Sequence, residues 1–323
     1  MNSLSRRNLI TGLAAGAVIS LARPALAKGR MIPEKVRARV IVDNDFAGDP
    51  DGLVALAHQL LSPRTRVTHA SSTFLSPEFT MPGVTVGKTA AQGHDIAAEL
   101  VRRLKPHSPP ILIAGAEGPI SAGRTPGAAA QAIVAEAMRD DPLPLWFTCG
   151  GPLTNLAEAL TLEPRIAARM KVAWIGGGGY PEGGWEYNLA MDAEAARTVI
   201  ERSDVPLWQV PQPTYRQMQM SVAELGADMR PISPFARWLY DRFTTPPDFV
   251  DLGGGWPMGD SPLVLLSALN AQSCVLREMT ARRITEKLGY GEEIPGRRIT
   301  VMERVDARFI HADFLARLKL HRR

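Results

Sequence analysis

The feature that most restricts the fold of this chain is a regular alternation of short apolar runs with amphipathic helical segments. Residues 39–43 form a β-branched run, and the segment after it places Leu53, Leu56 and Leu60 on one helical face. The alternation continues through strand-like runs at 67–73, 111–115, 145–149, 171–175 and 206–210 and helical segments at 88–104, 128–139, 153–159 and 192–202. Apolar strands separated by helices predict an open, mostly parallel, Rossmann-like α/β sheet with helices on both faces.

The C-terminal region is less regular than the rest of the chain. We predict helices near 233–243 and 261–270 and a strand at 298–304. The sequence contains no internal repeat and no low-complexity linker. We therefore expect one α/β domain over residues 28–323 with a helical or mixed C-terminal extension.

The N-terminus resembles an export signal. Arg6 and Arg7 lie in a twin-arginine-like SRRNLI sequence, a Gly- and Ala-rich apolar stretch follows, and ALA at 25–27 is typical of a cleavage site. The apolar stretch at 9–22 is shorter than the roughly 20 residues of a membrane-spanning helix, which argues against an anchor. We expect residues 1–27 to be a twin-arginine-type signal peptide. The mature protein is then periplasmic and has no membrane contact after cleavage.

Charge and cysteine content argue against two classes of protein. The chain has 37 Lys and Arg residues against 33 Asp and Glu residues, but three of the basic residues lie in the first 27. The remaining balance, about +1, does not predict a nucleic-acid partner. Cys149 and Cys274 lack the spacing of a zinc site, and the sequence leaves open whether they form a disulfide.

Four acidic residues follow the first strand-like run within nine positions: Asp43, Asp45, Asp49 and Asp51. Their mutual repulsion costs several kcal/mol unless a cation neutralises them or some stay protonated. Their spacing does not match an EF-hand loop, and helix capping accounts for one or two of them but not for all. Because ligands bind beyond the carboxyl ends of strands in such sheets, we predict a calcium or magnesium site here.

Three later motifs carry further candidates. Gly150 lies in a CGGP turn between a strand and a helix, where a free carbonyl can coordinate a hard cation; an ordinary turn is the alternative. Glu186 and Asn188 follow a run of four glycines, either as presented ligands or as exposed loop residues. Asp260 precedes an apolar helix, where an N-cap explains it as well as a metal ligand does.

Two other patterns carry no chemistry in this interpretation. The sequence GVTVGKT at 83–89 has three residues between its glycines where a phosphate loop has four. The histidines, including His58 and His69, form no ligand pair or triad spacing. We expect them to be packing or surface residues.

Together these motifs resemble the inosine–uridine-preferring nucleoside hydrolases. The resemblance rests on VIVDNDFAGDPDG, TCGGPLTN, WEYN and GDSPL, in this order, and runs from about residue 38 to 270. It implies an open α/β fold that binds Ca²⁺ at the carboxyl edge of its sheet and hydrolyses the N-glycosidic bond of ribonucleosides. The implied partner is a small nucleoside or riboside. The sequence leaves open whether the protein forms a homo-oligomer.

The resemblance also implies a role for each residue of the acidic loop. Asp43 supports the loop, and Asp45 both binds calcium and takes a proton from the attacking water. Asp49 hydrogen-bonds the ribose hydroxyls, and Asp51 is a bidentate calcium ligand.

Residues outside that loop complete the implied site. The Gly150 carbonyl and the Asp260 carboxylate are the remaining calcium ligands, and Glu186 and Asn188 bind the ribose hydroxyls. Carboxylates around the sugar stabilise an oxocarbenium-like transition state.

The chain departs from the family pattern at three places. Pro50 is inserted between acids that are adjacent in the family, and Gly259 stands where many members have His. The family's Asn after the second strand has no single counterpart among Ser71, Ser72, Thr73 and Ser76. Two alternatives follow: a non-catalytic, calcium-dependent periplasmic sugar- or nucleoside-binding protein, and a haloacid-dehalogenase-type phosphatase.

Overall fold

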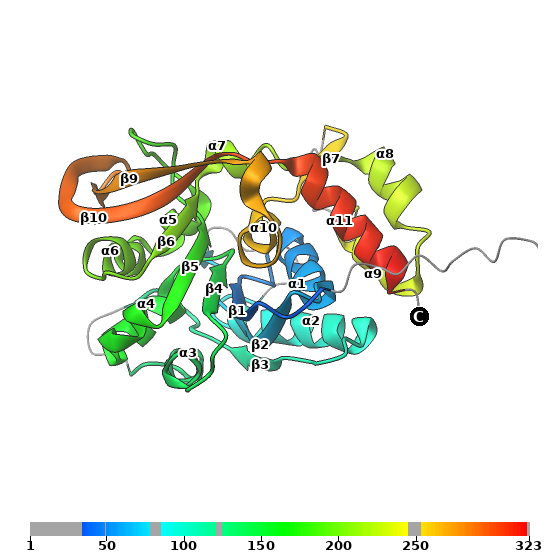
Figure 1. The fold of residues 1–323 in the computed structure, drawn as a ribbon, viewed down its shortest axis with the longest axis horizontal. Coiled ribbons are helices and arrows are strands. Elements are labelled where there is room, and N and C mark those ends of the chain that lie inside the picture. Colours follow the sequence, from blue (N-terminus) through cyan, green and yellow to red (C-terminus); the bar gives the residue numbers. More distant parts are fainter. Residues whose placement is uncertain (1–33, 49, 78–84, 121–124, 245–252, 322–323) are drawn as a thin grey trace, which may run out of the picture. The chain divides into compact units, whose positions relative to one another are not determined.

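The computed structural model describes residues 34–48, 50–77, 85–120, 125–244 and 253–321 (Figure 1). A compact unit begins at Lys35 and contains all of the elements below. The predicted signal peptide, residues 1–27, and Asp49 of the acidic loop both lie outside the described residues.

An eight-stranded sheet in the order β3-β2-β1-β4-β5-β6-β10-β9 forms the centre of this unit (Figure 1). Its strands are β1 (Ala38–Asn44), β2 (Thr65–Ser72), β3 (Ile111–Ala114), β4 (Leu145–Cys149), β5 (Met170–Ile175), β6 (Leu207–Val210), β9 (Val275–Ile284) and β10 (Tyr290–Arg304). All neighbouring pairs are parallel except β9 with β10. The predicted open, mostly parallel α/β sheet is confirmed.

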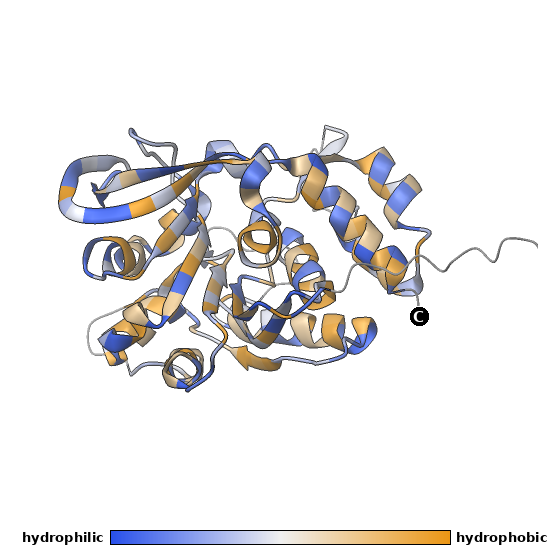
Figure 2. Cartoon of the chain, viewed as in Figure 1, coloured by the Kyte–Doolittle hydropathy of each residue, from blue (hydrophilic) through white to orange (hydrophobic). Residues whose placement is uncertain are grey.

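Helices cover both faces of the sheet, as predicted. One face packs α1 (Asp51–Leu61), α2 (Thr89–Leu104), α9 (Pro234–Phe243), α10 (Pro262–Ala268) and α11 (Ala307–Leu320). The other packs α3 (Ala128–Met138), α4 (Thr154–Leu162) and α6 (Ala193–Glu201). The helices carry both apolar and polar residues, as Figure 2 shows. Helices such as α2 and α6 have one buried side and one exposed side, whereas α1 and α10 are buried almost throughout.

Side-chain alternation in β1 explains why the sheet has two apolar cores. Val40 and Val42 belong to the core on the α1 face, whereas Ile41 between them belongs to the core on the α4 face. Successive residues of a strand point to opposite faces, so the middle of a strand covered on both sides is apolar at consecutive positions. The continuous run 39–43 therefore belongs to a central strand.

Short elements connect the larger ones. They are α5 (Tyr187–Met191), α7 (Gln212–Tyr215), α8 (Val222–Glu224), the 3₁₀ helices η2 (Pro164–Ala168) and η4 (Ala271–Ser273), the π-helix η3 (Leu225–Met229), and the antiparallel pair β7 (Gln219–Ser221) and β8 (Gly255–Pro257).

The C-terminal region is more closely integrated into the sheet than the sequence predicted. The predicted strand at 298–304 is the second half of β10, which pairs with β6 and thereby extends the central sheet. The prediction missed β9 and α11. Charged residues such as Arg277, Glu278 and Arg298 are exposed on the β9–β10 hairpin, and they hide its strand pattern.

The structure answers the question of cysteine pairing that the sequence left open. Cys149 and Cys274 are both free thiols, the first of them buried. In the described part of the chain, no helix combines the length and the apolar character needed to cross a membrane.

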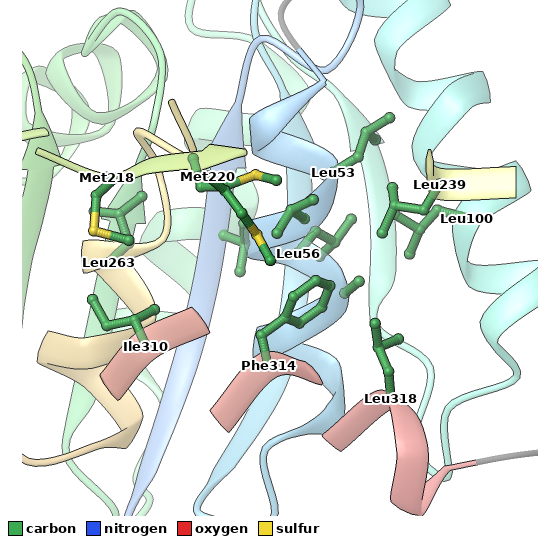
Figure 3. Packing of buried hydrophobic residues seen from close by; sticks show 14 of the residues in the cluster. Leu53, Leu56, Leu100, Met218, Met220, Leu239, Leu263, Ile310, Phe314 and Leu318 are labelled. Atoms are coloured by element: carbon green, nitrogen blue, oxygen red, sulfur yellow. The ribbon is translucent and has the colours of Figure 1, made fainter. Parts of the chain in front are cut away.

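Helix α11 closes the core on the α1 face. In Figure 3, Ile310 lies beside Leu263 of α10 and Phe314 lies beside Leu56 of α1. Ile310, Phe314 and Leu318 are all buried. Beside them, His58 of α1 is fully buried, and its Nε2 lies 2.8 Å from Oδ2 of Asp313. The interface between α1 and α11 therefore encloses an imidazole among apolar side chains.

Acidification is expected to weaken this interface. Burial lowers the pKa of His58 below its ordinary value of 6.5, and burial lowers the pKa of His311 to about 4. Below pH 6.5 the two imidazoles take up protons in the unfolded chain, whereas in the folded chain they stay neutral to a lower pH. The free energy of unfolding should therefore fall between pH 6.5 and 4, by about 1–3 kcal/mol for His311. Urea unfolding of wild type and His311→Leu across this range tests it, and an unchanged pH slope in the variant would contradict it.

Candidate active site

The predicted site residues lie on neighbouring strands at one edge of the sheet. Asp43 near the end of β1 pairs in register with Ser71 of β2 and with Cys149 of β4, and Cys149 pairs with Trp174 of β5. The strands are parallel, so the loops that leave them share the carboxyl edge. The acidic loop, the CGGP turn and the glycine-rich turn therefore meet at this edge.

Asp43 lies beneath the acidic loop rather than on its surface. It is fully buried and accepts hydrogen bonds from the Ser71 hydroxyl, the Asn155 amide at 2.8 Å and the Cys149 thiol at 3.8 Å. Burial raises the pKa of Asp43 to about 7 against the opposing effect of these hydrogen bonds. The contacts link the end of β1 to β2, β4 and α4, as a supporting residue would.

Asp45 begins the loop that follows β1. Its side chain is buried, and its carbonyl accepts a 2.7 Å hydrogen bond from the Gly48 amide, which turns the chain. Gly151 lies so close that a Cβ there would come within 3.2 Å of the Asp45 nitrogen and 2.6 Å of Thr73 Cγ2. The loop after β1, the residue after β2 and the turn after β4 are therefore in contact.

The inserted Pro50 occupies the N-cap position of α1. Its φ is near −70°. Its carbonyl accepts hydrogen bonds from the backbone amides of Leu53 at 3.1 Å and Val54 at 3.4 Å. Asp51 is then the first helical residue, where the helix dipole favours a negative charge. The helix start thus accommodates the insertion and leaves Asp51 at the site.

Asp51 and Asp260 are brought together from opposite ends of the chain. The Asp260 amide donates to Asp51 Oδ2 at 3.1 Å, and the Asn44 amide donates to Asp260 Oδ2 at 2.7 Å. Gly150 completes the group, because a Cβ on it would stand 2.5 Å from Asp260 Oδ2 and 2.3 Å from Asn44 Nδ2. Sequence reasoning missed Asn44, although its position between Asp43 and Asp45 was a signal.

Asn188 reaches the same turn from α5. Its amide donates to the Gly150 carbonyl at 3.0 Å and to the Ile175 carbonyl at 2.9 Å, while its Oδ1 is buried without a hydrogen-bond partner among the described atoms. Trp174 Nε1 donates to the Gly151 carbonyl at 3.0 Å. The carbonyls of the turn are therefore held in fixed directions, and Asn188 keeps an acceptor that a ligand can use.

Glu186 is the buried N-cap of α5. Its Oε2 accepts the Gly177 amide at 2.8 Å and the Leu189 amide at 3.0 Å, and its Oε1 accepts the Tyr215 hydroxyl at 3.0 Å. Burial raises the pKa of Glu186, and these hydrogen bonds oppose the increase. Tyr215, at the end of α7, is a second residue that the sequence interpretation missed.

The structure also separates the candidates for the missing Asn after β2. Ser71 is committed to Asp43, whereas Thr73 follows the strand and lies against Gly151. The Thr73 hydroxyl is buried without a hydrogen-bond partner among the described atoms. Of these two, Thr73 is the one that faces the turn.

The oxygen donors suit a hard cation in kind, although they do not form a closed metal site. In the described ranges, no three His, Cys, Asp or Glu side chains are grouped as a metal site. Asp51, Asp260 and the Gly150 backbone are nevertheless adjacent, and carboxylates and carbonyls are the ligands that calcium prefers. The chemistry of this donor set fits calcium and does not fit a soft metal.

The fold and the acid-lined carboxyl edge define an open α/β protein with a polar candidate site at the end of its parallel strands. The family described as "Inosine-uridine preferring nucleoside hydrolase" matches residues 40–311, and the chain belongs to this family. The resemblance is thereby confirmed, and the match favours neither the phosphatase nor the non-catalytic binding protein.

Curated relatives align over parts of their length. The chain is 42% identical over 77 residues to the inosine-uridine preferring nucleoside hydrolase of Crithidia fasciculata, which covers 23% of each protein. A Leishmania major relative aligns over 25% of its own length. The pyrimidine-specific ribonucleoside hydrolase RihA of Salmonella agona is 28% identical over 224 residues, 63% of this chain and 70% of that protein.

Solved structures show the same fold at low sequence identity. An inosine-guanosine nucleoside hydrolase superposes with a TM-score of 0.67 at 17% identity, covering 88% of this chain and 99% of that one. A purine-preferring ribonucleoside hydrolase from Gardnerella vaginalis gives 0.66 at 17% identity, covering 88% and 98%.

Proposed function

We propose that this protein hydrolyses the N-glycosidic bond of ribonucleosides or related ribosides with the help of calcium. The observation that carries the proposal is the meeting of Asp51, Asp260 and Gly150 beside Asn188 at the carboxyl edge of the sheet. Family membership supports it, because the relatives are named as nucleoside and ribonucleoside hydrolases.

The residues divide between the reacting water and the sugar. Asp45 is the general base that takes a proton from the attacking water. Glu186 and Asn188 bind the ribose hydroxyls, and Asp49 joins them from the acidic loop. Asp45, Asp51, Asp260 and the Gly150 carbonyl would hold the calcium ion. When bound, calcium supplies a water of lowered pKa and a fixed position for the ribose hydroxyls.

The carboxylates also stabilise the transition state. Positive charge develops on the sugar ring as the glycosidic bond breaks, and buried carboxylates stabilise such charge more strongly than water does. Glu186 and Asp45 are both buried at this edge. Water attacks the sugar directly, and the departing base leaves as the second product.

The mature protein is expected to release nitrophenol from a nitrophenyl riboside in the presence of calcium, with activity lost after chelation. Loss of the calcium ion would remove several kcal/mol of transition-state stabilisation, so EGTA should lower kcat by more than about 100-fold. Calcium should also raise the Tm, because a ligand that binds only the folded state stabilises it.

Asp260→Asn and Asp95→Asn make a matched pair for this experiment. Asp95 lies on α2 with a side chain 81% exposed, so its substitution should leave the calcium response intact. Asp260→Asn should remove the increase in Tm. Full turnover in EGTA, or no increase in Tm for wild type, would contradict the calcium requirement.

A further inference from the structure

Tyr215 joins the two halves of the site and has no role in the proposed mechanism. It ends α7, directly after β6, so it stands at the same carboxyl edge as the acids. The Gln212 amide at the other end of α7 donates to the Gly177 carbonyl at 2.9 Å. The glycine-rich turn therefore fixes α7 beside Glu186.

The Tyr215 hydroxyl completes the hydrogen bonding of Glu186. Glu186 Oε2 accepts hydrogen bonds from the backbone amides of Gly177 and Leu189, and Oε1 accepts one from the Tyr215 hydroxyl at 3.0 Å. The backbone amide of Asn188 also donates to the Glu186 carboxylate, and Oε1 is the oxygen that contacts Tyr215. The Tyr215 oxygen donates its only proton to Glu186 and accepts a hydrogen bond from the Gln212 side chain, so it keeps one acceptor lone pair. Two acceptors therefore stand next to each other.

The ring of Tyr215 extends toward the acids on the other side of the site. A Cβ on Gly259 would meet Tyr215 Cδ2 at 3.4 Å and Asp51 Oδ2 at 3.0 Å. The ring thus flanks Gly259, with Asp51 on one side of that glycine and Glu186 at the other end of the tyrosine. A side chain at position 259 would compete with the ring for this space.

We infer that Tyr215 is a positioning residue that directs Glu186 Oε1 at the sugar and offers a second acceptor to a vicinal diol. A ribose diol presents two adjacent hydroxyl donors, which matches the two adjacent acceptors. The ring restricts how Glu186 can turn, because it is held between that carboxylate and Gly259. This inference rests on the proposed riboside hydrolysis and adds a residue that orients its sugar-binding carboxylate.

Tyr215→Phe is the direct test, because it removes the hydroxyl and keeps the ring. With calcium present, KM for a nitrophenyl riboside is expected to rise about 10-fold, the size expected for a hydrogen bond to a charged group. The value of kcat should stay within about threefold, because the lost interaction forms in the ground state as well. A residue with only a structural role would instead lower the Tm or kcat.

A double-mutant cycle with Glu186→Gln separates positioning from independent effects. If Tyr215 acts through Glu186, adding Tyr215→Phe to Glu186→Gln should change KM by less than about twofold. Tyr240→Phe is the matched control, since Tyr240 is a part-buried tyrosine on α9 whose ring lies under Arg230. It should leave both constants unchanged.

The outcomes distinguish this inference from the proposed function. If the wild-type protein neither binds nor hydrolyses any riboside, both the proposed function and the role of Tyr215 are wrong. Active wild type with an unchanged KM in Tyr215→Phe, or with fully additive effects in the cycle, overturns only the role of Tyr215. A 10-fold rise in KM that disappears in the Glu186→Gln background supports the inference.

Discussion

Replacement of Asp45 by asparagine is expected to lower kcat for a nitrophenyl riboside by about 10²- to 10⁴-fold, the range that a general base contributes. The substitution keeps the size of the side chain, so the loop that turns through the 2.7 Å bond from Gly48 to the Asp45 carbonyl should persist. The amide cannot accept a proton from water. The measurement is steady-state kinetics at saturating calcium, with the Tm as a check on folding.

The matched control for this variant is Asp95→Asn, which makes the same change on the exposed surface of α2. It should retain wild-type kcat. If Asp45→Asn turns over the riboside as fast as wild type, another group takes the proton and the proposed mechanism is wrong. If Asp45→Asn binds ribose with wild-type affinity while turnover is lost, the defect lies in the chemical step.

The sheet and much of the site edge could be predicted because they depend on local patterns. A strand that is covered on both faces is mostly apolar, and β1, β4 and β5 all have an apolar majority, so the runs at 39–43, 145–149 and 171–175 stood out. In a parallel sheet these strands end at one edge. That rule alone placed the acidic loop, the CGGP turn and the segment around Glu186 near one another.

Residues that act through distant partners could not be predicted in this way. Asn44 meets Asp260 across 216 positions of sequence, and Tyr215 meets Glu186 only because β5 and β6 are neighbours. Neither contact can be inferred from the strand or helix periodicity of the sequence. β9 was missed for a different reason, since it is a hairpin strand that carries several exposed charged residues.

Gly150→Ala is expected to have the largest combined effect on stability and activity. The added Cβ would stand 2.3 Å from Asn44 Nδ2 and 2.5 Å from Asp260 Oδ2, and both distances are below any real contact. These two groups are buried and joined at 2.7 Å, so neither can move without breaking that bond. We expect the free energy of unfolding to fall by about 1–3 kcal/mol, as in other overpacked sites.

Activity should fall further than this loss of stability explains, because the displaced groups belong to the site. Asp260 would move away from Asp51, and a 1 Å misplacement costs on the order of 100-fold in rate. Gly118→Ala is the control, since a Cβ there meets no described atom within 4 Å. Urea unfolding and riboside kinetics on both variants test the prediction. Wild-type stability and turnover in Gly150→Ala would show that Asp260 need not stay against this turn, and the metal side of the site would need another arrangement.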